Sequence, residues 1–211
     1  MQHDVALSAH GIRLIPLSPL HAGILFDFVD SGMWAGLAAN LPLSVEELAS
    51  LFAARLDDAS TIPFAVTDHF TGALLGTSSL CDFDLRQQRV EIGGTFYGRQ
   101  FWGTHVNPAS KHLLLSYAFD VLAVHRVAFR CDATNTRSAG AIARLGARYE
   151  GTLRRHRLAP DGGRSDTAVF SILRHEWPDI RQGLLERLAP FALPERPGVD
   201  FDTGLPSGQA A

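Results

Sequence analysis

The 211-residue sequence has few cysteines, almost no lysine and no long uninterrupted apolar segment. Its two cysteines, Cys81 and Cys131, are too few for a disulfide framework or a four-ligand zinc site. Both lie in apolar runs, so we expect buried free thiols in a reducing compartment. No apolar run reaches the roughly 18–20 residues that cross a bilayer, and the N-terminal MQHDVALSAH lacks the regions of a signal peptide. We therefore expect a cytoplasmic globular protein with no membrane partner.

Arginine supplies nearly all of the positive charge, because the chain has eighteen arginines and a single lysine, Lys111. Nine of these arginines fall between residues 126 and 164, where the acids are Asp132, Glu150 and Asp161. A local excess of positive charge in a chain of net charge −3 indicates a polyanionic ligand near this third of the sequence. A solvated surface balanced by acids from elsewhere in the chain explains the pattern equally well.

Hydrophobic periodicity divides the chain into strands and helices, with a loop expected over residues 33–42. Helix starts are marked at Ser18, Ser44 and Asn107, because serine and asparagine accept hydrogen bonds from first-turn amides and proline fits the first turn. Expected helices occupy residues 18–32, 44–56, 107–124, 135–145 and 180–191. Expected strands occupy residues 11–17, 61–68, 73–83, 90–97, 125–132, 147–158 and 166–173.

This order of elements predicts an α+β fold with a mixed, mostly antiparallel central sheet flanked by helices. The helix at 107–124 separates the strands at 90–97 and 125–132, so these two strands can pair in parallel. We expect a single domain over residues 10–178. Residues 179–211 are expected to form a C-terminal helix and a loosely ordered tail, because the end of the chain is rich in proline, glycine and small residues.

The segment QFWGTHVN, residues 100–107, joins a strand to a capped helix and is the most informative part of the sequence. Unpaired backbone N–H groups and the helix dipole make such a junction suitable for phosphate, although most junctions of this kind bind nothing. Gly93 and Gly94 lie inside the preceding strand, where glycine indicates a bulge or the close approach of a ligand. A bulge that serves only the twist of the sheet is about equally common. Together, the two features suit a ligand with amides at one end and phosphates at the other, as in coenzyme A.

Three stretches of the chain resemble the GCN5-related N-acetyltransferases (GNAT). They are VEIGGTFYGRQFWGTHVN, HRVAFRCDATNTRSAGAIARLGARYEGTLRRHR and DTAVFSILRHEWP, and the resemblance covers about residues 14–177. Within that superfamily the sequence is similar to the branch of ribosomal-protein N-terminal (alanine and serine) acetyltransferases and many bacterial relatives. The resemblance implies splayed parallel strands that bind acyl-CoA.

The resemblance also implies transfer of an acyl group, most simply acetyl, from acyl-CoA to a primary amine, either a small molecule or a protein N-terminus. Attack would be direct in a ternary complex, because neither cysteine has the surroundings of a nucleophile. A non-catalytic acyl-CoA-binding sensor is the alternative, and an RNA-associated protein using the arginines is a weaker third. The resemblance and the apolar C-terminal segment favour a homodimer.

The family's phosphate loop, Gln/Arg-x-x-Gly-x-Gly/Ala, maps onto Gln100, Gly103 and His105, and His105 departs from it. A side chain there either crowds the pyrophosphate or donates a hydrogen bond to it, and the otherwise intact loop favours the hydrogen bond. By the same resemblance, Asn135 and Ser138 contact the cofactor near its thiol; a helix cap is the other interpretation of Asn135. The implied acyl-CoA-binding residues are Gly94, Thr95, Phe96, Gln100, Trp102, Gly103, Thr104, His105, Val106, Asn107, Asn135 and Ser138.

Many relatives carry a tyrosine seven residues after the asparagine to protonate the departing thiolate, and this chain has Ile142 there. Ser138 or water is the substitute, and a thiol pKa near 8.5 makes the loss tolerable. Glu91 is the candidate general base through a water molecule; an ion pair with Arg130 is the equal alternative.

Met33 and Trp34 would line the acceptor side by resemblance, with ordinary packing as the alternative. For Lys111, a solvated surface position is favoured over a contact with phosphate. The nine histidines show no metal-ligand spacing, so no metal is expected.

Overall fold

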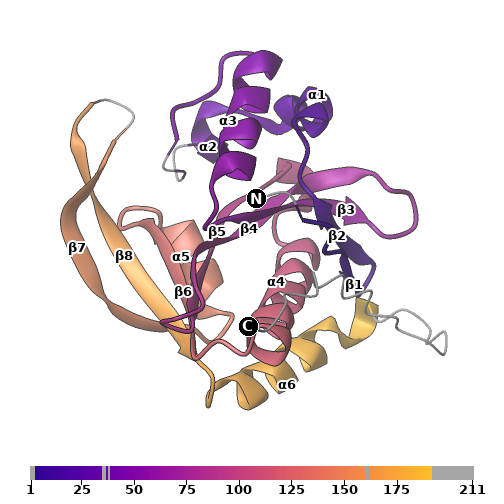
Figure 1. Cartoon of the computed structure of the whole chain (residues 1–211), viewed down its shortest axis with the longest axis vertical. Coiled ribbons are helices and arrows are strands. Elements are labelled where there is room, and N and C mark those ends of the chain that lie inside the picture. The colour runs from indigo at the N-terminus through magenta and orange to yellow at the C-terminus, as the bar shows by residue number, and fades with distance from the viewer. Residues whose placement is uncertain (1–2, 35–36, 38, 160–161, 192–211) are drawn as a thin grey trace, which may run out of the picture.

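The computed structural model describes residues 3–34, 37, 39–159 and 162–191, and these form an eight-stranded sheet with helices on both faces (Figure 1). The strand order is β1-β2-β3-β4-β5-β6-β8-β7. The strands are β1 (Leu7–Ala9), β2 (Ile12–Pro16), β3 (Ile62–Asp68), β4 (Leu74–Asp84), β5 (Arg89–Tyr97), β6 (Arg126–Asp132), β7 (Arg148–Leu158) and β8 (Arg164–Leu173).

Every neighbouring pair of strands in this sheet is antiparallel except β5 and β6, which are parallel. The expectation of an α+β fold with a mostly antiparallel sheet is therefore confirmed, and so is the position of its parallel pair. The strand β1, which forms a tight hairpin with β2, was not anticipated from the sequence.

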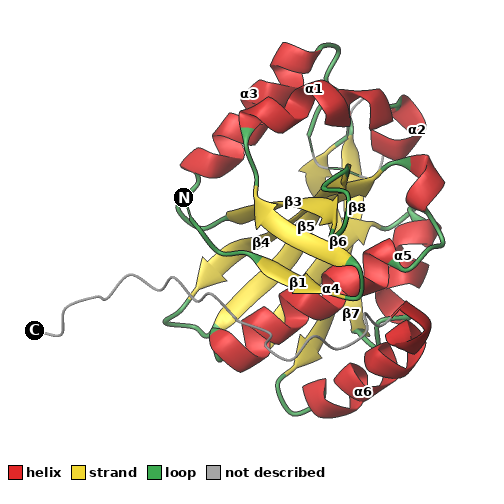
Figure 2. Ribbon diagram, turned by 90° about the vertical axis from the view of Figure 1, so that its right-hand side faces the viewer, coloured by secondary structure: helices red, strands yellow, loops and turns green. Residues whose placement is uncertain are grey.

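The helices form two layers, with α1, α2 and α3 over one face of the sheet and α4 and α6 over the other (Figure 2). Each layer covers its own buried cluster. Leu48 and Phe52 of α3 pack with Ala65 and Phe96 on one side, and Leu114 of α4 belongs to the larger cluster on the other. The helices are α1 (Ala22–Leu25), α2 (Ser31–Trp34), α3 (Val45–Asp57), α4 (Val106–Ser116), α5 (Thr136–Ala143) and α6 (Trp177–Leu188). A π-helical turn, Tyr117–Val121, continues α4.

Two of the expected helix starts are confirmed by their caps. Ser44 Oγ accepts a hydrogen bond from Glu47 N at 3.2 Å, and Asn135 Oδ1 accepts one from Ser138 N at 3.0 Å. The expectation that Asn107 caps the long helix is wrong, because α4 begins at Val106 with His105 as its N-cap. Pro108 therefore occupies the third position of the helix, where a missing N–H group still costs no hydrogen bond within the helix.

The single helix expected over residues 18–32 is a series of short pieces. Ser18 caps a 3-10 turn at Pro19–His21, which is followed by α1, by a second 3-10 turn at Phe26–Phe28 and then by α2. At the other end of the chain, α6 begins at Trp177 and places Trp177, Leu184 and Leu188 in the main core. The expected boundary at residue 178 thus falls inside a packed helix. The tail over residues 192–211 and the turn residues 160–161 lie outside the described part of the chain.

Candidate functional site

The parallel strands β5 and β6 pair over only three residue pairs and then part. Arg89, Val90 and Glu91 pair with Arg126, Val127 and Ala128, whereas the opposite edges of both strands stay paired with β4 and β8. Beyond Glu91 the edge of β5 that faces β6 therefore presents backbone groups without a strand partner. Such groups can pair with an extended ligand that contains amides.

A β-bulge lies where the two strands part. On β4, Thr77 and Ser79 are two positions apart, and they oppose Phe96 and Gly93 of β5, which are three positions apart. Gly94 supplies the extra residue at a φ of 57°, a left-handed conformation that favours glycine. The bulge predicted from Gly93 and Gly94 is thus present in the structure.

The carbonyl of Gly94 is held from the α3 side of the sheet. Its oxygen accepts hydrogen bonds from Thr77 Oγ1 at 2.9 Å and from Arg55 Nη1 at 3.2 Å. Arg55 comes from α3, and burial lowers the pKa of its guanidinium. A side chain at Gly94 would lie 2.9 Å from Arg55 Nη1, so the guanidinium of this arginine packs directly against the bulge.

Lys111 holds the bulge from the α4 side. Its ammonium donates hydrogen bonds to Thr95 Oγ1 at 2.6 Å and to Ser78 Oγ at 2.9 Å, and these two hydroxyls are 2.7 Å apart. The residue is only 6% exposed, and burial lowers its pKa to about 7. The expectation of a solvated lysine is therefore wrong, as is that of a lysine reaching for a phosphate. The charged residue points into the fold because it lies on the face of α4 that packs against the sheet.

The loop before α4 presents free backbone donors, as expected for an anion site. Within the described residues, the N–H groups of Gly103, His105 and Asn107 have no hydrogen-bond acceptor. The N–H of Val106 is bonded to Thr104 Oγ1 at 3.3 Å. Gly103 has a φ of 76°, and a side chain there would meet no other atom within 4 Å, so the space beside it is open. Open space, unpaired N–H groups and a helix N-terminus together favour a phosphate.

The side chain of His105 packs away from that open space. Its ring stacks on Phe191 with centroids 4.4 Å apart, and its Nε2 lies 3.8 Å from the position a side chain at Gly11 would take. The histidine that replaces a small residue of the family pattern thus has a packing role at the start of α4. A hydrogen bond from it to a phosphate stays a prediction.

Trp102 links the loop before α4 to α5 on the other side of the parted strands. Its indole Nε1 donates to the carbonyl of Tyr97 at 3.0 Å, and the guanidinium of Arg137 lies 3.6 Å from its ring centroid. The guanidinium of Arg99 lies 4.8 Å from the same centroid, and it pairs with both carboxylate oxygens of Asp30. Gln100 folds its amide back over Gly98. Arg137 is therefore a second cation beside the loop, and no carboxylate in the described chain pairs with it.

Glu91 lies at the last residue pair before the strands part. Its carboxylate pairs with Arg130 of β6, which also pairs with Asp82 of β4. The ion pair expected as the alternative for Glu91 is thus present. The Glu91 side chain is 13% exposed, and burial raises its pKa, while Arg130 acts in the opposite direction. A carboxyl group with a raised pKa beside an open strand edge suits a general base.

Asn135 and Ser138 lie at the start of α5, across the parted strands from the bulge. The amide oxygen of Asn135 is engaged by the N–H of Ser138, which agrees with its interpretation as a helix cap. The hydroxyl of Ser138 lies close enough to Cys131 to lower the pKa of that thiol, although burial raises it overall. Ile142, at the position of the family's tyrosine, is buried in the main core.

Met33 and Trp34 belong to α2 and are buried, at 4% and 2% exposure. The Trp34 ring lies 5.5 Å from that of Phe96, and its Nε1 donates to the carbonyls of Ala39 and Asn40. Both residues therefore pack under the α3 layer, in agreement with the packing alternative. Their contact with an acceptor stays a prediction.

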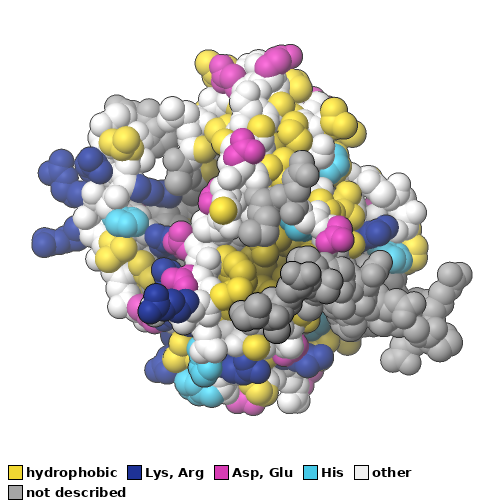
Figure 3. All heavy atoms as spheres, in the orientation of Figure 1, with side chains coloured by type: hydrophobic (Ala, Val, Ile, Leu, Met, Phe, Trp, Pro, Cys, Tyr) yellow, Lys and Arg dark blue, Asp and Glu magenta, His cyan; other side chains and the backbone are white. Residues whose placement is uncertain are grey.

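Arginine side chains gather over the β7–β8 hairpin (Figure 3), in agreement with the clustering in the sequence. Arg126 and Arg157 of this group pair with Glu150 and Asp132, whereas Arg154, Arg155 and Arg164 are exposed. The cluster is thus balanced by acids only in part.

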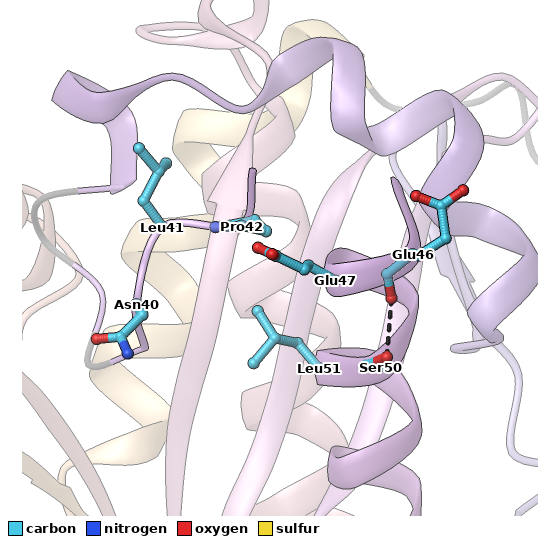
Figure 4. A pocket seen from close by; sticks show the side chains of 7 residues that line it. All are labelled: Asn40, Leu41, Pro42, Glu46, Glu47, Ser50 and Leu51. Atoms are coloured by element: carbon cyan, nitrogen blue, oxygen red, sulfur yellow. Dashed lines mark hydrogen bonds between the residues drawn. The ribbon is translucent and has the colours of Figure 1, made fainter. Parts of the chain in front are cut away.

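A separate pocket of about 390 Å³ lies between the segment 40–42 and the first half of α3 (Figure 4). None of the residues predicted from the sequence to form the site lines it. Over the described residues, no group of three or more His, Cys, Asp and Glu side chains could hold a metal ion. No helix in that part of the chain is long and apolar enough to cross a membrane.

Sequence reasoning did not identify Arg55, Lys111 or Asp82 as part of this site. The first two lie in helical patterns and the third near the end of a strand, and such patterns do not reveal which group a side chain reaches. Glu91, Gly94, Gly103 and the loop before α4 were identified, and the structure places them in succession along β5 and the loop that follows it.

Residues 12–148 match the protein family described as "Acetyltransferase (GNAT) domain". The "Putative ribosomal N-acetyltransferase YdaF" of Bacillus subtilis (strain 168) is 32% identical over 108 residues. That match spans 51% of this chain and 58% of the relative.

Solved structures extend the similarity to most of the chain. A "putative acetyltransferase" from T. thermophilus is 31% identical, with 89% of this chain and 99% of that chain covered and a TM-score of 0.82. A GCN5-related N-acetyltransferase from Brucella melitensis is 28% identical, with 90% and 87% covered and a TM-score of 0.82.

Proposed function

The chain belongs to the GNAT acetyltransferase family, and we propose that it transfers the acetyl group of acetyl-CoA directly to a primary amine in a ternary complex. The observation that carries the proposal is the parting of β5 from β6 after Glu91, next to the bulge and in line with the start of α4. Two proteins of the same fold support the choice of donor. RimJ of Mycobacterium smegmatis, 18% identical, was crystallised with CoA-disulfide, and a spermidine N-acetyltransferase from Vibrio cholerae, 17% identical, with CoA and spermine.

Acetyl-CoA would bind as an added strand along the free edge of β5. Its pantetheine amides would pair with the backbone of Gly94, Thr95 and Phe96, because these groups have no partner on β6. Its phosphates would accept hydrogen bonds from the N–H groups of Gly103, His105 and Asn107, assisted by the dipole of α4. The rest of the loop, with Gln100, Trp102, Thr104 and Val106, would shape the same site.

Transfer requires a neutral amine nitrogen to attack the thioester carbonyl. Glu91 would accept the proton of the amine through a water molecule, since burial raises its pKa toward the range of a general base. A C–N bond forms, backbone N–H groups at the bulge stabilise the oxyanion, and the C–S bond then breaks. The nitrogen loses its extra proton and the leaving thiolate takes up a proton, with Ser138 or water as the relay between them, which yields an N-acetyl amine and free CoA.

The acceptor belongs to the class of primary amines, and both small molecules and protein N-termini fit the chemistry. A sensor that binds acyl-CoA without turnover remains the second candidate, because Ile142 replaces the family's tyrosine acid. The homodimer and the choice of acetyl over a longer acyl group also stay predictions.

Calorimetric titration with acetyl-CoA tests the binding site, with Gly103→Glu and Gly103→Gln as a matched pair. Both variants have the same bulk and the same unfavourable backbone conformation at a φ of 76°, so only charge distinguishes them. We expect Gly103→Glu to bind at least about tenfold more weakly than Gly103→Gln, since a carboxylate would lie beside the phosphates. Equal affinities would place the phosphates elsewhere.

Thiol release from acetyl-CoA with a panel of primary amines separates the enzyme from the sensor. Turnover with any amine supports acetyl transfer. Tight binding of acetyl-CoA without turnover across polyamines, amino sugars and peptides with a free N-terminus would favour the sensor.

A further inference from the structure

The single lysine of the chain is buried beneath the bulge without a carboxylate partner. Lys111 Nζ bonds only to hydroxyls in the described structure, Thr95 Oγ1 and Ser78 Oγ. A buried cation without a counter-ion costs free energy that a leucine or methionine at the same position would not cost. Packing alone therefore does not account for a lysine here.

The groups around Lys111 do not neutralise it. Cys81 of β4 is the ionisable group whose charge acts on it, and burial raises the pKa of that thiol to about 11, so it is neutral near pH 7. Arg55 of α3 contributes a second cation on the opposite side of the bulge, where it bonds to the carbonyl of Gly94. Basic side chains from two helices thus reach two adjacent residues of β5, Gly94 and Thr95.

Thr95 connects Lys111 to the backbone that would face the substrate. Its hydroxyl accepts the hydrogen bond from Lys111 at 2.6 Å, and its own peptide N–H belongs to the bulge. An anion that forms beside this backbone would be attracted by a cation one threonine side chain away, in surroundings where burial reduces screening.

We propose that Lys111 is a positioning residue for acyl transfer, which fixes the bulge through Thr95 and Ser78 and holds a positive charge behind the peptide groups that face the thioester carbonyl. The inference rests on the proposed function, since the bulge must hold the thioester. The oxyanion exists only in the transition state, so the contribution of Lys111 appears in kcat rather than in the affinity for acetyl-CoA.

The test compares wild type with Lys111→Met, Thr95→Val and Thr95→Ser. Lys111→Met keeps a long, unbranched side chain and removes a buried charge, so the variant is expected to fold. Thr95→Val removes the hydroxyl at constant shape, and Thr95→Ser retains it. We expect Lys111→Met and Thr95→Val each to lower kcat by at least tenfold, with the Kd for acetyl-CoA changed less than threefold. Thr95→Ser, which keeps the hydroxyl that Lys111 contacts, should retain more of the wild-type kcat than Thr95→Val.

A second measurement does not depend on turnover. Binding of anionic CoA should raise the pKa of Lys111, so the wild type should take up protons on binding near pH 7.5. Calorimetry in buffers of different ionisation enthalpy measures this uptake, and Lys111→Met corrects for protons bound by CoA itself.

The double variant Lys111→Met/Thr95→Val tests whether the two residues act together. Its kcat should be no more than about twofold below that of Lys111→Met, because both residues act through one contact.

Each outcome separates this inference from the proposed function. If wild type neither binds acetyl-CoA nor turns it over, the proposed function fails. If wild type is active and Lys111→Met has the same kcat and the same proton uptake, Lys111 has no role in transfer. A large loss of acetyl-CoA affinity in Lys111→Met with unchanged kcat would also overturn the inference, because the residue would then serve binding alone.

Discussion

Arg130 sets the acidity of Glu91, and replacing it should move the pH dependence of catalysis. In the structure Arg130 pairs with Glu91 and with Asp82 at the point where β5 and β6 part. The Arg130→Gln variant removes the only cation that pairs with Glu91 in the described structure and leaves the negative charge of Asp82 beside it. Burial and Asp82 both raise the pKa of Glu91, and only Arg130 lowers it. The pKa of Glu91 should therefore rise further in the variant.

The size of the shift follows from the geometry of the pair. Two unit charges about 4 Å apart attract by roughly 4 kcal/mol at an effective dielectric constant of about 20. Arg130 is 34% exposed, so solvent screening reduces this to about a third, or about 1.4 kcal/mol. That free energy corresponds to about one pH unit. Since a general base acts only when it has lost its proton, the acid limb of kcat should move up by about one unit.

The assay is thiol release from acetyl-CoA with a saturating amine, measured over pH 5 to 9. Asp82→Asn is the matched control, because it removes the other charge beside Glu91 and should move the acid limb down. Glu91→Gln should lower the rate far more than the affinity for acetyl-CoA and should abolish the limb. An acid limb that stays in place in Arg130→Gln, or that survives in Glu91→Gln, would refute the role of Glu91 as base.

The pH dependence of the free energy of unfolding tests the same change in the pKa of Glu91 independently. In Arg130→Gln the folded-state pKa of Glu91 lies above the unfolded value, so the native state binds more protons between the two. The free energy of unfolding should therefore fall as pH rises through that window and level off above it. Asp82→Asn should show a weaker dependence of the same sign or none.

Two further changes probe the bulge. Gly94→Ala places an alanine in a left-handed backbone conformation and brings its methyl group within 2.9 Å of Arg55 Nη1. The variant should therefore lower the free energy of unfolding by about 1–2 kcal/mol in urea titrations. Gly72→Ala is its control, because Gly72 has a φ of 72° with nothing within 4 Å, and equal losses would mean that Arg55 does not crowd the bulge. For Lys111, the folded pKa of about 7 lies below the unfolded value near 10.4, so the unfolded state binds more protons in between. The free energy of unfolding of wild type relative to Lys111→Met should therefore be flat below pH 7 and rise by up to about 1.4 kcal/mol per pH unit toward pH 10. Parallel curves would contradict a lowered pKa of Lys111 in the folded state.

The strands and capped helices could be predicted because their signals are local. Ser44 and Asn135 mark the starts of α3 and α5 with side-chain hydrogen bonds to residues three positions on. Glycines inside a strand pattern marked the bulge, because only a conformation such as that of Gly94 requires glycine there. Each of these features depends on a few neighbouring residues and can therefore be recognised without knowledge of the fold.

The errors in the fold have equally local causes. The turn between β1 and β2 uses His10 and Gly11, both at positive φ, in place of the Asn-Gly or Asp-Gly pair that indicates a hairpin. Asn107 resembled a cap followed by proline, yet the N-cap of α4 is His105, two residues earlier, since proline is accepted anywhere in a first turn.

The electrostatic setting of the site could not be predicted, because it arises from residues far apart in the chain. Arg55 reaches Gly94 across 39 positions, and Arg130 reaches Asp82 across 48. A charged residue on a helix is ordinarily solvated, and nothing in the sequence near Lys111 indicates that its face of α4 packs on the sheet. Only the fold shows that basic side chains from α3, α4 and β6 reach Gly94, Thr95 and Glu91 of β5.

The site around the bulge has two opposed electrostatic requirements. Glu91 needs a high pKa to accept a proton, which a surplus of positive charge opposes, whereas an oxyanion at the bulge needs that surplus. The structure separates them by pairing Arg130 with both Glu91 and Asp82, and by directing Arg55 and Lys111 to the carbonyl of Gly94 and the hydroxyl of Thr95. Asp82 offsets the charge of Arg130 at Glu91, while no carboxylate within the described residues offsets Lys111. The effects of Arg130 and Lys111 should therefore be separable, one on the pH dependence of the base and the other on kcat.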